Sequence, residues 1–169
     1  MTEPWLRGTH REMDAVERAV IHALELAGED VDKWCAKLTD EELNARPFDL
    51  PPVAFHLRHI ARSLDRLLSY AEGTQLDSTQ KAELRTEMDK GTTRTEVTAE
   101  LSAALFGAIE RVRAFSPEHY NAERGVGRLM LPTTIGGLLV HCADHTQRHV
   151  GQAITTAKLL VAMRVSAVG

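Results

Sequence analysis

Three side chains with donor atoms recur at helical spacing towards the C-terminal end of the chain. His145 and His149 are four residues apart, and Gln152 follows three residues later. At about 100° per residue on an α-helix, His149 lies about 40° from His145, and Gln152 lies about 20° to the other side. The three therefore share one stripe. A helix ordinarily gives its inward face to apolar side chains, so this stripe of nitrogen donors indicates a pair of metal ligands.

A second histidine window lies earlier in the chain, at His56 and His59. Residues three apart lie about 60° from one another on a helix, so we expect only one of the two to face a given centre, and spacing leaves the choice open. Two imidazoles from one helix and one from another make the three-ligand arrangement of catalytic zinc sites, in which water or substrate takes the fourth position. The sequence therefore predicts a metal site between two helices.

Several neighbours of these windows could take part in binding. His141 extends the stripe by one turn and could be a fourth ligand, an outer donor, or a polar residue near the start of the helix. Gln152 could hydrogen-bond a bound ligand or be a buried polar group satisfied by helix packing. Arg66 lies about 20° off the His59 stripe, where its guanidinium could bind an anionic substrate or simply lie at a solvated end of the bundle.

The remaining candidates favour structural roles. Cys142 is more simply a buried cysteine than a ligand, and Gly151 is expected to allow another helix or the wall of the site to approach closely. His10, His22 and His119 lie outside both windows and are expected as surface or core histidines.

Apolar periodicity predicts four long helices that must position these residues. Two shorter helices and a loop or small hairpin are expected in the connections. Gly28 is expected to stop the first long helix as a left-handed cap, and Thr39 opens the first short helix with a capping box. The long helices are predicted at 11–27, 53–70, 95–115 and 134–163, the short ones at 39–45 and 78–88, and the loop or hairpin at 121–132.

These elements predict an all-α fold, because no segment alternates as a strand would. Four long amphipathic helices in a chain of 169 residues favour a single domain, 1–169, built as a four-helix bundle with short extra helices in its long connections. The long connections permit crossover as well as simple up-and-down links, so spacing leaves the topology open.

Composition excludes several functions. The formal charge of −4 lacks the basic surplus of a nucleic-acid-binding protein. The sequence has neither a signal-peptide segment nor an apolar run long enough to span a membrane, so a cytoplasmic location is expected. Cys35 and Cys142 are far apart and have no metal-finger spacing, and in a reducing compartment both are expected as free thiols.

The strings His59-Ile60-Ala61 and His145-Thr146-Gln147-Arg148-His149-Val150-Gly151-Gln152 resemble the DinB-like superfamily, which includes metal-dependent thiol transferases and mycothiol-dependent maleylpyruvate isomerases. Helix order and length agree across nearly the whole chain. The resemblance implies an up-down-down-up four-helix bundle, frequently a homodimer. It also implies that His59, in preference to His56, joins His145 and His149 in holding a divalent metal, commonly zinc or nickel.

The resemblance further implies a function: activation of a low-molecular-weight thiol for transfer to an electrophile. A thiol with a pKa near 8.5 is mostly protonated at neutral pH, and a divalent cation can replace that proton. Arg66 and Gln152 are the candidates for binding the thiol cofactor, and the expected partners are a small-molecule thiol and an electrophile. Two alternatives stay open: a hydrolase that activates water on the same metal, and a non-catalytic helical module that binds metal or dimerises.

Overall fold

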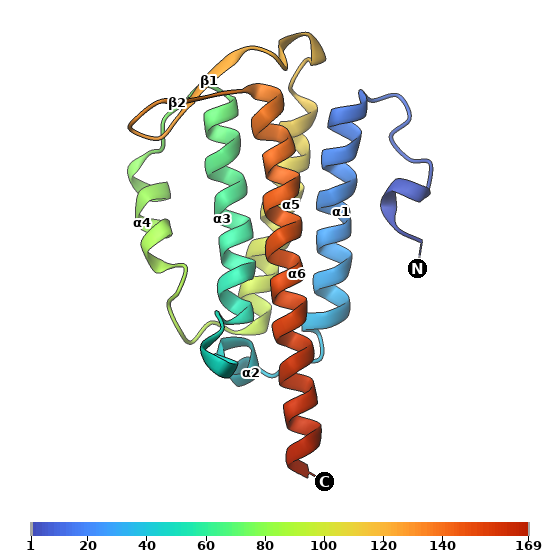
Figure 1. The fold of residues 1–169 in the computed structure, drawn as a ribbon, viewed down its shortest axis with the longest axis vertical. Coiled ribbons are helices and arrows are strands. Elements are labelled where there is room, and N and C mark those ends of the chain that lie inside the picture. Colours follow the sequence, from blue (N-terminus) through green and yellow to red (C-terminus); the bar gives the residue numbers. More distant parts are fainter. Residues whose placement is uncertain (1, 169) are drawn as a thin grey trace.

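The computed structural model describes residues 2–168 and shows four long helices lying side by side (Figure 1). Because each of the four predicted apolar stripes is long enough to bury a helix face, each becomes one of these helices. Their bounds are α1 Ala15–Cys35, α3 Val53–Ala71, α5 Arg94–Arg113 and α6 Ile135–Val168.

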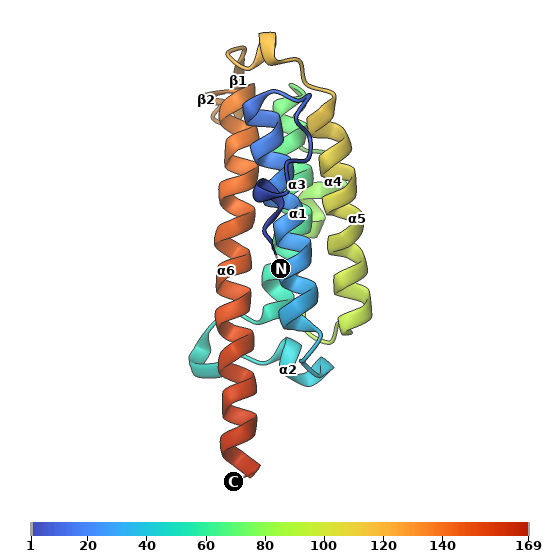
Figure 2. The ribbon, with the colours of Figure 1, turned by 90° about the vertical axis from the view of Figure 1, so that its right-hand side faces the viewer.

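Helices α1 and α6 run in one direction and α3 and α5 in the other (Figure 1). This is the up-down-down-up course that the resemblance implies, and it confirms the predicted fold class. Helices α1 and α3 each pack against both α5 and α6, and a view from the side shows α5 and α6 on opposite sides of that pair (Figure 2). The face between α3 and α6 is therefore where the two histidine windows meet.

The predicted end of the first helix at Gly28 was wrong. Helix α1 continues to Cys35, because Val31 and Cys35 extend its apolar stripe and are both buried. A Cβ atom placed on Gly28 would lie 3.5 Å from the Cδ1 atom of Leu105, an ordinary van der Waals contact, so α5 packs on α1 at this position.

The connections hold short elements close to those predicted. Thr39 caps the first short helix with the predicted capping box, and Asp77 caps the second in the same way through Gln80. The segment predicted as a loop or hairpin is an antiparallel two-stranded hairpin. The bounds are α2 Asp40–Asn44, α4 Ser78–Thr86, β1 Glu123–Val126 and β2 Leu131–Thr134, with short 3-10 helices at η1 Pro4–Leu6, η2 Pro47–Asp49 and η3 Pro117–His119.

The hairpin runs directly into α6. Strand β2 ends at Thr134 and α6 begins at Ile135, whose backbone N–H donates to the carbonyl of Ala122 at 3.1 Å. The N–H of Gly136 donates to the carbonyl of Tyr120 at 2.8 Å. These bonds satisfy two of the backbone donors that a helix start leaves without partners, and they fasten the beginning of α6 to the segment before β1.

The four long helices share one core of aliphatic side chains. Members such as Ile21, Leu57, Leu101 and Leu139 are fully or almost fully buried, and each such burial stabilises the fold by about 1.5–3 kcal/mol. No helix within residues 2–168 is long and apolar enough to cross a membrane.

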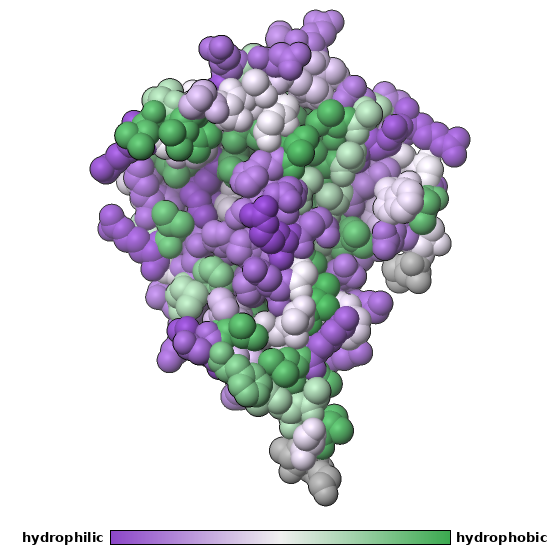
Figure 3. All heavy atoms as spheres, in the orientation of Figure 1, coloured by the Kyte–Doolittle hydropathy of each residue, from purple (hydrophilic) through white to green (hydrophobic). Residues whose placement is uncertain are grey.

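On the face shown in Figure 3, polar side chains gather over the middle, where α3 and α6 lie, and apolar ones cover the hairpin and the projecting end of α6. Leu129, Met130 and Leu131 are exposed in the hairpin, and Met163 and Val165 are exposed on α6.

Candidate metal centre between α3 and α6

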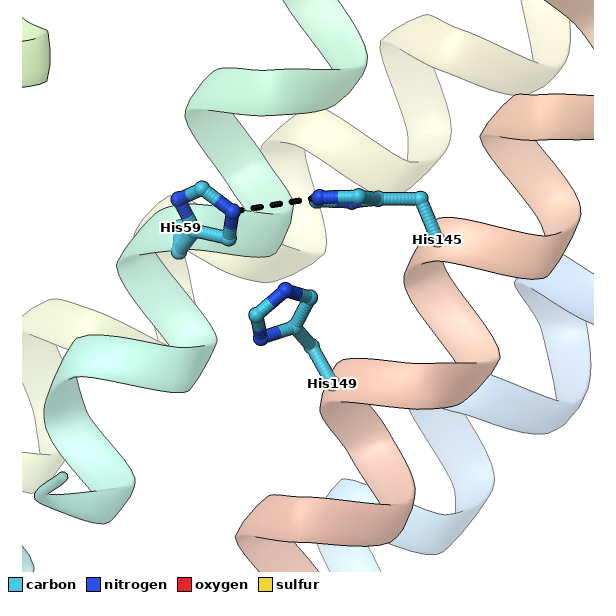
Figure 4. A group of neighbouring side chains, drawn as sticks. All are labelled: His59, His145 and His149. Atoms are coloured by element: carbon cyan, nitrogen blue, oxygen red, sulfur yellow. Dashed lines mark hydrogen bonds between the residues drawn. The ribbon is translucent and has the colours of Figure 1, made fainter. Parts of the chain in front are cut away.

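Three histidines from two helices converge between α3 and α6. The rings of His59 on α3 and of His145 and His149 on α6 point towards one another (Figure 4). Their ring centroids lie 4.4 to 4.9 Å apart, and one ring nitrogen from each lies within 4.8 Å of the other two. His145 and His149 share one face of α6 because they are four residues apart, and His59 faces them from α3. The three donors therefore lie close together.

The separation of the facing nitrogens suits a tetrahedral ion. The Nε2 atoms of His59 and His145 are 3.1 Å apart. Two nitrogens bound to zinc at 2.0–2.1 Å in tetrahedral geometry would be about 3.4 Å apart, so a shift of a few tenths of an ångström would accommodate the ion. The donor set of three imidazoles is also one that zinc and nickel accept.

Each of the three rings uses its Nδ1 atom to contact a partner outside the cluster. His59 Nδ1–H donates to Glu87 Oε2 at 2.7 Å, His145 Nδ1 lies 3.3 Å from Ser63 Oγ, and His149 Nδ1 lies 3.0 Å from His56 Nδ1. The Nε2 atom is therefore the available donor of every ring. Metal-ligating histidines commonly donate their other ring N–H to an outer partner, which fixes the tautomer and the orientation of the ring.

Glu87 is a functional residue that the sequence analysis did not single out. It directly follows α4 and is only 4% exposed. Its Oε2 atom accepts from His59, and its Oε1 atom accepts from Arg66 NH1 at 2.8 Å. Burial would raise the pKa of Glu87, but the hydrogen bonds from His59 and Arg66 outweigh it and hold the pKa below its ordinary value. The carboxylate stays ionised and fixes His59.

The electrostatics of the cluster keep the two imidazoles of α6 neutral. Burial, reinforced by the neighbouring histidines, lowers the pKa of His145 and of His149 to about 4. Burial likewise lowers the pKa of His56 to about 4. Because a metal binds the neutral form of histidine, His145 and His149 are ready to bind at neutral pH without losing a proton.

Arg66 and Gln152, the candidates for binding a cofactor, lie on opposite sides of the cluster. Arg66 is 8% exposed rather than solvated, and its guanidinium is engaged by Glu87. With His59 and His145 it lines a pocket of about 250 Å³. Gln152 is exposed rather than buried, and with His149 it lines a larger pocket of about 490 Å³. Binding of a cofactor by either residue stays a prediction.

The larger pocket has apolar walls and a polar edge. Leu50 and Phe55 contribute apolar surface, and Arg148, whose guanidinium donates to Asp144 Oδ2 at 2.5 Å, lies at the edge with Gln152. Gly151 also lines this pocket, and a Cβ atom there would meet nothing within 4 Å. The prediction that Gly151 allows another helix or the wall of the site to approach closely was wrong, because this side of α6 faces the open space of the pocket.

The other residues near the windows are not among the three donors. His56 is buried and supports His149, whereas the side chain of His141 is 47% exposed beside Asp144. Cys142 and Cys35 are both free thiols, as predicted, and the predicted burial of Cys142 is confirmed; Cys35 is buried as well. Burial raises the pKa of Cys142 to about 12 and that of Cys35 to about 11, so both thiols stay protonated and neither is a ligand or nucleophile.

A family model of the DinB superfamily matches residues 23–153. The chain belongs to the DinB superfamily. The segment matched by the DinB family model contains His59, His145 and His149. It begins after His22, so residues 2–22, which include the first turns of α1, lie outside the match.

A solved structure supports the same fold for the DinB chain. A crystal structure described as the conserved protein of locus from Enterococcus faecalis is 19% identical, with a TM-score of 0.73, and the match covers 89% of this chain and 99% of that one. At this identity the likeness shows the fold alone. A comparison with curated proteins found no match. DinB membership and the geometry together identify a possible divalent-metal site made by His59, His145 and His149.

Proposed function

We propose that this protein is a metal-dependent transferase that joins a low-molecular-weight thiol to an electrophile. The observation that carries the proposal is the common arrangement of the three rings, in which Nδ1 of His59, His145 and His149 contacts an outer partner and leaves Nε2 for the centre. Three protein donors with room for a fourth ligand are typical of catalytic rather than structural zinc sites.

A bound zinc or nickel ion would supply the positive charge that replaces the proton of a thiol at neutral pH. Three neutral imidazoles leave that charge uncompensated, which favours an anionic sulfur. Glu87 holds His59 in place, and Ser63 and His56 orient the other two rings. The chain's own cysteines are buried and protonated, so the reacting thiol comes from outside.

The two pockets support separate places for two reactants. The 490 Å³ pocket beside His149 offers Leu50 and Phe55 to an apolar electrophile, with Gln152 and Arg148 at its edge for a polar group. The 250 Å³ pocket beside His59 and His145 is reached from the other side and includes Arg66. A reaction between two molecules gains rate when both are held close and oriented.

A hydrolase is less well supported by the same site. Hydrolysis is faster when a side chain takes the proton of the attacking water. The carboxylate that contacts the cluster is Glu87, and both of its oxygens are already engaged, by His59 and by Arg66. This arrangement suits a positioning role for Glu87 and favours a thiol, whose proton leaves easily, as the substrate.

The test is a transferase assay on the zinc-loaded or nickel-loaded protein with a panel of small thiols and two electrophiles, an epoxide and an activated alkene. We expect a thioether product, identified by mass spectrometry, with at least one thiol. The variant His145→Ala/His149→Ala should lose the activity, and His119→Ala, which changes an exposed histidine in η3, should keep it. Absence of thiol-dependent turnover by a fully loaded protein would contradict the proposal.

A further inference from the structure

The N-terminal arm, residues 2–14, folds back along α1 (Figures 1 and 2). Two histidine contacts and an ion pair hold it there. Arg7 pairs with Glu29 at 2.5 Å, Thr9 Oγ1 lies 3.0 Å from His22 Nε2, and His10 Nε2 lies 2.8 Å from Glu25 Oε1. The arm thus brings His10 to two residues of α1 that already share one face, since His22 and Glu25 are three residues apart.

We propose that His10, His22 and Glu25 bind a second divalent cation, independent of the three-histidine cluster. One donor atom from each lies within 4.8 Å of the other two. Two histidines and one glutamate are a donor set that binds zinc with three protein ligands. The site would join the arm to α1, whereas the first cluster joins two long helices.

The local structure presents these donors in a way that fits an ion. His22 is only 7% exposed, and burial lowers its pKa, which favours the neutral form that binds metal. His10 has a backbone φ of 56°, a left-handed conformation that few non-glycine residues adopt. In this conformation its ring reaches Glu25 on α1, so the arm is shaped around the contact between the two donors.

Access and charge indicate the class of cation. His22 lines a surface pocket of about 370 Å³ together with Thr9, Arg11 and Arg18, so an ion can enter from solvent. The positive charges of Arg11 and Arg18 repel a cation, and Glu25 is the single carboxylate among the three donors. Charge attraction alone would therefore not hold an ion here. Imidazole nitrogen favours zinc, nickel or copper over magnesium or calcium, so the expected occupant is a transition metal such as zinc.

The proposal is tested by counting zinc ions on the full-length protein. The chelator-stripped protein is titrated with Zn²⁺ by calorimetry, and zinc is measured after desalting. We expect two ions per chain for the natural sequence. His145→Ala/His149→Ala should keep one, at His10, His22 and Glu25, and Glu25→Gln should keep the other.

Two further variants separate loss of a ligand from loss of structure. His10→Asn removes the imidazole while retaining a residue type that tolerates the left-handed backbone, and it should also bind one ion fewer. His119→Asn makes the same change on an exposed histidine in η3 and should leave two ions. Circular dichroism checks that each variant is folded.

Limited trypsin digestion gives a second measurement on the arm. Zinc at ten times its dissociation constant should slow cleavage after Arg11 about tenfold in the His145→Ala/His149→Ala variant, because binding reduces the population of the released arm. With Glu25→Gln added, zinc should have no effect on the cleavage rate. No zinc on the His145→Ala/His149→Ala variant would overturn the proposal, whether or not the arm variants fold. A single zinc on the natural sequence that this variant loses would have the same meaning, because only the first cluster would then bind.

Discussion

The two donor clusters use similar side chains but are positioned by different means. His59, His145 and His149 all project from long helices whose opposite faces are buried in the common core. In the second cluster, His10 projects from an arm that is joined to α1 by partly exposed polar contacts such as Arg7 with Glu29. Exposed ion pairs contribute little to stability, so the first cluster is built into the bundle and the second depends on where the arm lies.

The comparison also separates two uses of glutamate. Glu87 stands behind His59 and orients it, while Glu25 lies among the donors of the second cluster. Precise sites are built on helices and supported by outer hydrogen bonds, and only the first cluster has such a support for each ring. We therefore expect the first to bind metal more tightly.

The largest effect is expected from removing a donor of the first cluster. His149→Ala should weaken zinc binding there by more than about 100-fold, because loss of a direct ligand exceeds the loss caused by an outer partner. Helical content should be nearly unchanged, since the aliphatic core is untouched. Calorimetry and circular dichroism measure the two quantities, with His119→Ala in η3 as the exposed control. Loss of helical content in His149→Ala would instead mark the metal as structural.

A smaller loss is expected when the outer carboxylate is changed. Glu87→Gln keeps the shape but weakens the hold on His59, so zinc affinity at the first cluster should fall by about 10–100-fold. Glu118→Gln, at an exposed position in η3, is the matched control. Unchanged zinc affinity in Glu87→Gln would show that helix packing alone positions His59.

The pH dependence of stability tests the burial of the histidines at the first cluster in the metal-free protein. His56, His145 and His149 have a pKa of about 4 in the folded protein and an ordinary value of 6.5. The unfolded chain therefore binds more protons between these values, and the free energy of unfolding should fall as pH drops from about 6.5 to about 4. Denaturant melts of the metal-free protein at pH 7 and pH 4.5 measure this fall.

A variant tests whether the buried histidines cause this fall in the free energy of unfolding. His56→Gln removes one of the three groups and should make the fall shallower, whereas His119→Asn should leave it unchanged. An equal fall in all three proteins would show that other groups govern the acid sensitivity.

The smallest effect is expected at Gly151, next to the first cluster. Gly151→Ala adds a Cβ atom that meets nothing within 4 Å and should stabilise the helix by about 0.5–1 kcal/mol. Zinc affinity should not change, because α6 already holds the donors in place. A thermal melt and a zinc titration are sufficient. A change in zinc affinity would indicate that the local backbone of α6, and not its packing, sets the positions of the rings.

Much of this fold could be predicted because its signals are local. The apolar stripes of α3, α5 and α6, the capping box at Thr39 and the histidine spacing on α6 all lie within a few turns of chain. The end of α1 was mispredicted because a glycine can end a helix or lie within one, and the burial of Val31 and Cys35 carries α1 past Gly28.

The outer parts of both clusters could not be predicted because they depend on distant segments. Glu87 is 28 residues from His59 and follows a charged, weakly amphipathic helix, so nothing local separates it from its acidic neighbours. The spacing of three residues between His22 and Glu25 could have indicated two donors on one face of α1. The position of His10 beside them depends on how the N-terminal arm folds, which the sequence pattern does not show. Side chains that are brought together by a loop have no regular spacing in the sequence, so a search for helical spacing does not find them.

The direct passage from β2 into α6 governs which parts of the molecule can change length during evolution. Because the segment before β1 fastens the first turn of α6, one residue inserted between Ile135 and His145 would turn the later histidines by about 100° and carry them away from α3. An insertion at the hairpin tip, near Leu129, would leave that rotation untouched. Natural variants are therefore expected to gain or lose residues at the tip while the spacing from Ile135 to His149 stays constant.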